Sequence, residues 1–188
     1  RVFYTFGYSW ENDAFTLGVL KPAIELLAHL DGGLDPEQEA HLFEGHAWIC
    51  ARLKIPVWAD YIAFTAGGSI LPRDKPGRVI KRGGGAEHPY VDSAEVLKLC
   101  KKFNKSTRPR PNHNGKRPDD IARFCVGHVY ALAAFFLACS AMAKIRGKGS
   151  LGPDHLRDIS LTVLSEFLAH GAAEDPLVNH YREACKAL

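Results

Sequence analysis

Residues 124–143 read Phe124-Cys125-Val126-Gly127-His128-Val129-Tyr130-Ala131-Leu132-Ala133-Ala134-Phe135-Phe136-Leu137-Ala138-Cys139-Ser140-Ala141-Met142-Ala143, and none of these twenty residues carries a formal charge. A stretch of this length could cross a bilayer. It contains more alanine than leucine, however, together with Gly127, His128 and Ser140, and it lacks interfacial tryptophans. We therefore predict a central helix that is buried on all sides in a helical domain, with a membrane-spanning helix as the alternative.

The segments before this stretch have the apolar spacing of amphipathic helices. One helix is predicted from Phe15 to Leu30, where Pro22 either kinks it or marks a new first turn. A second begins at Asp35-Pro36, with Asp35 as its cap, and is predicted to stop at Pro56. Its predicted inward face consists of Leu42, Phe43, Ile49 and Leu53.

Glycines and prolines interrupt the helical pattern between residues 67 and 89, which predicts a long loop or a loose hairpin around Arg78-Val79-Ile80. A third helix is predicted from Ser93 to Phe103, and two amphipathic helices fill the final third, with Ile159 and Val163 among their inward residues. At 188 residues and 46% hydrophobic composition, the chain can bury the core of one domain. The predicted fold class is mainly α.

The five cysteines are far apart in the sequence and include no Cys-x-x-Cys pair. Neither a zinc site nor a disulfide framework has this spacing, so we expect reduced thiols in a cytoplasmic protein. These residues are Cys50, Cys100, Cys125, Cys139 and Cys185. The sequence opens on Arg1, without a methionine or a signal peptide, which suggests a chain that was processed or cut from a longer protein.

The first thirteen residues have the pattern expected at the end of an α/β structure, whereas the rest of the chain has a helical pattern. Residues 2–6 are β-branched or aromatic, as in a buried strand, and Gly7 ends the run. Ser9 can then cap a helix whose first turn contains Glu11. Ligands and metals bind at the carboxyl edge of such sheets, so this segment is predicted to be the last strand of an α/β site.

The run Thr5-Phe6-Gly7-Tyr8-Ser9-Trp10-Glu11-Asn12 is similar to the Tyr-Ser-x-Glu-Asn signature of a bacterial family found with ABC-type or AAA ATPases in anti-phage systems. A TOPRIM-like nuclease half precedes the signature in that family, and a helical half follows it. Gly127-His128 shows a weaker similarity to the same family. The sequence departs from the pattern at Asp13-Ala14, where Tyr-Leu is usual, and it has no upstream Asp-x-Asp pair.

The resemblance implies that residues 1–13 are the terminal strand and turn of a TOPRIM-like α/β sheet and that residues 14–188 are a helical domain with a basic loop at 104–118. Glu11 would be the catalytic carboxylate and a ligand of Mg²⁺ or Mn²⁺, and Tyr8, Ser9 and Asn12 would complete the motif. The substrate would be DNA or a structured RNA, with an ATPase as a possible partner. For Glu11 the alternative is a helix-capping role, and for the chain it is a non-catalytic nucleic-acid-binding or partner-docking module.

Positive charge is concentrated in residues 73–123, which contain fourteen Lys or Arg and six acidic residues, a formal charge of +8. The whole chain is +3, so the remainder sums to −5. A flexible, proline-broken cationic stretch at 101–117 suits contact with a phosphate backbone, and a solvated loop is the alternative. The predicted nucleic-acid-binding residues of this stretch are Lys101, Lys102, Lys105, Arg108, Arg110, Lys116 and Arg117. The family resemblance implies that Arg123 and His128 also face the nucleic acid or the TOPRIM-like half; for His128, a place in the core is the alternative.

His41 and His46 superficially resemble a metal-binding pair. Five residues of helix rotate about 500°, which leaves the two side chains about 140° apart. We therefore predict that they share no metal from one helix face and have structural or surface roles.

Overall fold

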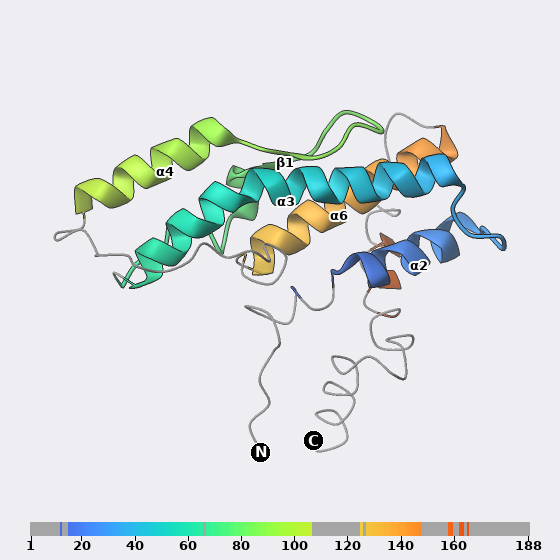
Figure 1. Cartoon of the computed structure of the whole chain (residues 1–188), viewed down its shortest axis with the longest axis horizontal. Coiled ribbons are helices and arrows are strands. Elements are labelled where there is room, and N and C mark those ends of the chain that lie inside the picture. The colour runs from blue at the N-terminus through green and yellow to red at the C-terminus, as the bar shows by residue number, and fades with distance from the viewer. Residues whose placement is uncertain are drawn as a thin grey trace, which may run out of the picture.

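The structure is a computed structural model that describes Asn12, residues 15–65 and 67–106, Cys125, residues 127–147, and positions 158, 159, 162, 163 and 165. Four helices and a two-stranded sheet form this part of the chain, and 70% of it is helical (Figure 1). The elements are α2 (Leu17–Ala28), α3 (Pro36–Thr65), the 3₁₀ turn η1 (Pro76–Arg78), β1 (Ile80–Lys81), β2 (Tyr90–Val91), α4 (Ser93–Ser106) and α6 (Gly127–Arg146). The predicted mainly α class is confirmed, whereas the predicted strand at residues 2–6 lies outside the described residues.

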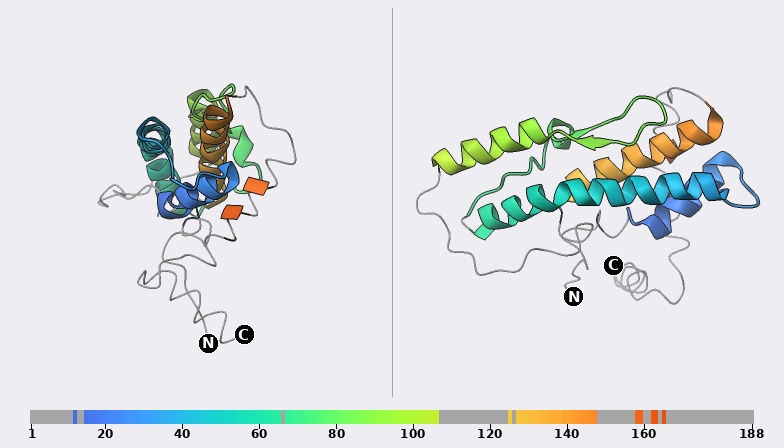
Figure 2. Two further views of the ribbon diagram at one scale, coloured as in Figure 1. Left: turned by 90° about the vertical axis from the view of Figure 1, so that its right-hand side faces the viewer. Right: turned by 45° about the horizontal axis from the view of Figure 1, so that its top comes forward.

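Helix α6 is the central element, and it contacts α2, α3, η1 and β1. Figure 2 shows it beside α3, and the small sheet contacts both helices, with β1 against α6 and β2 against α3. Within the described part of the chain α6 is the one helix with the length and apolar composition to cross a membrane, and 61% of its most apolar stretch is buried inside the protein. This burial agrees with the predicted core helix, and the alanines let neighbouring helices approach closely.

Helix α2 runs through Pro22 without interruption, so Pro22 does not mark a new first turn. Its inward face consists of Leu20, Ala23 and Ile24. The helix ends at His29, which adopts a left-handed conformation (φ 56°) and donates its backbone N–H to carbonyls of the last turn.

Helix α3 is thirty residues long and also passes through its proline, so the prediction that it stops at Pro56 is wrong. A proline inside a helix removes one backbone hydrogen bond. Here Leu53, Pro56 and Val57 are all buried, and burial of this apolar surface offsets that loss.

The start of α3 and most of its inward face follow the prediction. The backbone N–H of Gln38 donates to Asp35 Oδ1 over 2.8 Å, and the N–H of Asp35 donates to Gln38 Oε1 over 3.1 Å, a reciprocal cap. Phe43 is the exception, because it is 44% exposed. It lies one residue after the fully buried Leu42, and one residue rotates a side chain by about 100°.

The predicted loose hairpin is present as an antiparallel pair of two-residue strands, in which Ile80 is opposite Val91 and Lys81 is opposite Tyr90. The chain then enters α4 at once. Asp92 joins the two elements, because its N–H donates to the Val79 carbonyl over 2.8 Å and its Oδ1 accepts the N–H of Glu95 over 3.0 Å.

Among the last described positions, Ile159 and Val163 are buried in the core, as predicted. Cys50, Cys100, Cys125 and Cys139 are free thiols, and Cys185 lies outside the described residues.

Candidate nucleic-acid interface

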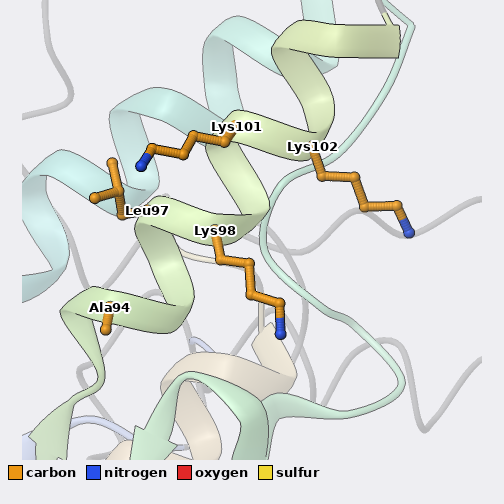
Figure 3. A pocket seen from close by; sticks show the side chains of 5 residues that line it. All are labelled: Ala94, Leu97, Lys98, Lys101 and Lys102. Carbon is orange, nitrogen blue, oxygen red and sulfur yellow. The ribbon is translucent and has the colours of Figure 1, made fainter.

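Three lysines line a pocket on the outer face of α4. We call this face, which carries Lys98, Lys101 and Lys102, the lysine face. Val96 is buried and Leu99, Cys100 and Phe103 are half-buried, so these residues form the side that packs on the domain. A pocket of about 460 Å³ lies on the other side (Figure 3), and its lining includes Ala94, Leu97, Lys98, Lys101 and Lys102. In this view Leu97 and Lys101 project to one side of the helix, and Lys98 and Lys102 project to the other.

Few acidic residues balance the positive charge of this face. Helix α4 contains four lysines and a single acid, Glu95. Arg78 donates from both Nε and Nη2 to Glu95 Oε1, and this hydrogen bonding lowers the pKa of the Glu95 carboxyl. Lys98 Nζ lies 3.4 Å from the other oxygen, Oε2. No ion pair within the described part of the chain involves Lys101 or Lys102, so both ammonium groups are available to an anion.

The predicted basic stretch at 101–117 therefore begins inside a helix. Lys101, Lys102 and Lys105 lie in α4, which continues to Ser106, so the first part of the stretch is neither flexible nor proline-broken. The same holds for residues 104–106 of the predicted loop. Capping by Asp92 and the buried side of the helix explain this order. The predicted site residues Glu11, Tyr8, Ser9, Arg108, Arg110, Lys116, Arg117 and Arg123 lie outside the described residues, as does the side chain of Lys105.

His128 is exposed on the first turn of α6, so the reading that places it in the core is wrong. Its Nδ1 donates to the carbonyl oxygen of Arg73 over 3.0 Å. The structure thus joins His128 to the loop after α3, on a different helix from Lys101 and Lys102.

Asn12, the last residue of the signature, is only 3% exposed. Its Nδ2 donates to the carbonyl oxygen of Cys125 over 3.0 Å. This bond joins the N-terminal signature to the residues that lead into Gly127-His128, the second segment in which the resemblance was found.

Exposed aromatic residues lie at the C-terminal end of α3. Tyr61 is 46% exposed and Phe64 is 61% exposed. The helix ends just beyond them, where Gly67 adopts φ +77° and the N–H groups of Gly67 and Gly68 donate to the carbonyls of Phe64 and Ala63. A methyl group added at Gly68 would lie 2.5 Å from the Phe103 ring, so the end of α3 lies against the last turns of α4.

A buried carboxylate fixes the loop that follows. Asp60 is 6% exposed, and its Oδ1 accepts the hydroxyl of Ser69 over 2.9 Å and the N–H groups of Ile70 and Leu71 over 2.5 and 2.8 Å. Hydrogen bonds of this kind to a charged group are strong. These bonds tie the loop at residues 69–71 to the last turns of α3.

Local sequence indicates little of this aromatic end, because Tyr61 and Phe64 lie in an aromatic segment that contains no distinguishing motif. Lys98 was detectable, because positions 94, 97, 98, 101 and 102 have the i, i+3, i+4 spacing of one helix face.

His41 and His46 have structural roles at the packing of α3 against α6. Ser140 Oγ donates to the Leu137 carbonyl over 3.1 Å and accepts from His41 Nε2, also over 3.1 Å. His46 Nε2 lies 2.9 Å from the Tyr130 hydroxyl. The two side chains thus contact different partners on α6, and no group of three His, Cys, Asp or Glu residues able to hold an ion occurs among the described residues.

His88 completes this cluster from the loop between the two strands. Its Nε2 donates to the His41 carbonyl oxygen over 3.0 Å, and the two rings are 4.2 Å apart between centroids. Burial above all, together with repulsion from His88 and Lys144, lowers the pKa of His41 to about 4, against the opposing pull of Glu44 and Glu37. His41 is therefore neutral at physiological pH.

Comparison with protein-family models, with curated proteins and with solved structures finds no significant match to this chain.

Proposed function

We propose that this protein binds nucleic acid through the lysine face of α4 and that it is the helical part of a TOPRIM-like, metal-dependent nuclease of the cytoplasm. One observation carries the binding proposal. Lys98, Lys101 and Lys102 are among the residues that line one pocket on the outer face of α4, a helix whose only acid is paired with Arg78.

The residue type indicates the part of the nucleic acid that is contacted. A lysine ammonium is a compact charge with three donors and little directional preference, so it suits phosphate oxygens more than base edges. We expect binding that is nearly independent of sequence and that weakens steeply with salt, because each neutralised phosphate releases counterions.

The nuclease part of the proposal is supported by the resemblance of residues 5–12. Mg²⁺ or Mn²⁺ held by carboxylates would activate water and stabilise the phosphoryl oxygens during phosphodiester hydrolysis. The described residues contain no such set of ligands, so we assign the metal to Glu11 together with carboxylates from outside the described part. An ATPase partner belongs to the same proposal.

Salt-dependent binding tests the lysine face. Affinity for a fluorescein-labelled oligonucleotide is measured between 50 and 300 mM salt, on the order of the range in which such contacts respond, for the wild type and for the triple variant Lys98→Ala, Lys101→Ala, Lys102→Ala. If all three lysines contact phosphates, the log–log slope falls by about 2 to 3. Lys21→Ala is the matched control, because Lys21 lies on α2 and is paired with Glu39 at 2.7 Å. Equal slopes in the wild type and the triple variant would remove this face from nucleic-acid binding.

A cleavage assay with Mg²⁺ separates the two forms of the proposal. It uses the chain joined to a TOPRIM-like half, because this chain alone supplies only Glu11 of the expected carboxylate set and is expected to be inactive. Cleavage by the joined protein that is lost in Glu11→Ala supports the nuclease. Salt-dependent binding without cleavage by the joined protein supports the alternative, a non-catalytic nucleic-acid-binding module.

A further inference from the structure

We propose that the nucleic acid bound here is single-stranded and that its bases stack on Phe64 and Tyr61 while Lys101 and Lys102 hold its backbone. This inference rests on the proposed nucleic-acid binding and adds to it the class of substrate. It comes from one juxtaposition: two exposed aromatic residues at the end of α3 and two exposed lysines in the last turns of α4 lie at the same end of the domain.

The contact between Gly68 and Phe103 brings the end of α3 against the last turns of α4, the helix that carries the two lysines. Gly68 is four residues after Phe64, and Phe103 is the residue directly after Lys102. The Phe103 ring lies so close to Gly68 that an added methyl group would be 2.5 Å from it. Figures 1 and 2 show the same arrangement at larger scale, because α3 and α4 run in a similar direction and end at the same side of the molecule.

The two rings have the placement that stacking requires. Tyr61 and Phe64 are three residues apart on one helix, so they project from neighbouring positions of its surface. Both are in the last turns of α3, shortly before the chain leaves the helix at Gly67, and they are 46% and 61% exposed. The Asp60 hydrogen bonds hold this end in place, so little order has to be gained when a ligand binds.

The pairing of aromatic and cationic groups distinguishes single strands from duplexes. Bases of a single strand expose their π-faces, and proteins bind them with aromatic rings beside a cationic track for the backbone. In a duplex each base is already stacked between its neighbours, so exposed rings add nothing to phosphate contacts. Truncating one stacking ring therefore weakens single-strand binding about five- to 150-fold and leaves duplex binding unchanged.

The test uses the full 188-residue chain and labelled single-stranded DNA, single-stranded RNA and duplex DNA of one length and sequence, with affinities from fluorescence anisotropy. The variants are Phe64→Ala, Tyr61→Ala, Phe64→Leu and the pair Lys101→Ala, Lys102→Ala. Phe64→Leu is the matched control for stacking, since it keeps an apolar side chain but removes the π-face. Phe64→Tyr keeps the ring and is expected to restore wild-type binding.

We expect the wild type to prefer both single strands over the duplex, the ring truncations and Phe64→Leu to reduce only single-strand affinity, and the lysine pair to reduce all three affinities. Wild-type affinity of the ring variants for single strands, with weaker binding by the lysine pair, overturns the single-strand inference and leaves the proposed function standing. Absence of binding to all three probes overturns both.

The same variants are also followed by light scattering, because exposed aromatic rings can serve protein contacts. A change in self-association in Phe64→Ala, with unchanged single-strand affinity, would assign the rings to a protein interface and overturn the inference. Thermal melts confirm that each variant is folded.

Discussion

The two halves of α3 belong to one continuous helix but meet very different surroundings. In the first half Gly45 lies so close to α6 that an added methyl group would be 2.5 Å from Leu137 Cδ1, and His41 and His46 are bonded to α6 side chains. In the second half Ile55, Tyr61 and Phe64 are 71%, 46% and 61% exposed.

The direction of α6 explains this difference. His41 pairs with Ser140 and His46 with Tyr130, so the two helices run in opposite directions. Helix α6 begins at Gly127, only three residues before Tyr130, whereas α3 continues for nineteen residues beyond His46. At 1.5 Å per residue, α3 extends roughly 20 Å past the start of α6. The first half of α3 thus packs on α6, although Phe43 and Trp48 are 44% and 47% exposed there, and the second half extends past the start of α6.

The largest effect is expected where α3 and α6 pack. Leu137 is fully buried, so Leu137→Ala should lower the free energy of unfolding by about 2 to 5 kcal/mol. Leu97→Ala is the matched control, since Leu97 is 54% exposed on α4, and its effect should stay within about 0.5 kcal/mol. Urea denaturation measures both. Similar losses in the two variants would mean that α6 is not the centre of the core.

Two glycines in helices provide the next comparison. Gly45→Ala should destabilise by about 1 to 3 kcal/mol because the methyl group meets Leu137 and His88. Gly18→Ala should stabilise by up to about 1 kcal/mol, because alanine favours a helix and the nearest atom, Thr16 Oγ1, is 3.8 Å away. Opposite shifts in melting temperature are expected. A gain in stability from both substitutions would contradict the close approach of α3 and α6.

Acidification should loosen the histidine cluster. The folded-state pKa of His41 is about 4, below the unfolded value of 6.5, so the unfolded chain binds the proton more readily between these values. Stability contributed by neutral His41 is therefore complete above pH about 6.5 and is lost as the pH falls towards 4, by about 1 to 2 kcal/mol once solvent screening of the partly exposed ring is allowed for.

Unfolding free energies measured from pH 7 to pH 4 check this expectation, and His41→Gln is the comparison because it cannot titrate. The variant should lose less stability over this range than the wild type. Parallel pH profiles would show that His41 does not contribute to the pH dependence.

The smallest stability effect is expected at the other end of α3. Phe64→Ala removes a ring that is 61% exposed and should change the free energy of unfolding by no more than about 0.5 kcal/mol. A loss close to that of Leu137→Ala would show that this end of the helix is part of the core and would weaken the contrast between the two halves.

The local sequence pattern predicted that these helices form. It predicted neither the end of α3 nor the elements that pack against the helices. The apolar spacing around Leu42, Ile49 and Leu53 predicted an inward face that the structure confirms. The rule that proline stops a helix failed at Pro56, because burial on the core face outweighs the loss of one local hydrogen bond.

The local sequence pattern also did not predict which residues far apart in the sequence contact each other. The rotation between His41 and His46 excluded a shared metal, but nothing near them indicated that α6 would supply Ser140 and Tyr130. Likewise, the lysines of α4 were predicted from composition, whereas their proximity to Phe64 depends on how two helices end against each other.

The central position of α6 also affects how the chain folds during synthesis. Helices α2 and α3 are complete once Thr65 has been made, but the helix that covers them ends at Arg146. Ribosomes add about 5 to 20 residues per second, so this interval lasts on the order of 4 to 16 s. For those seconds Leu42, Ile49 and Leu53 of the nascent chain lack the helix that buries them. We expect chaperones at the ribosome exit to bind this exposed apolar face.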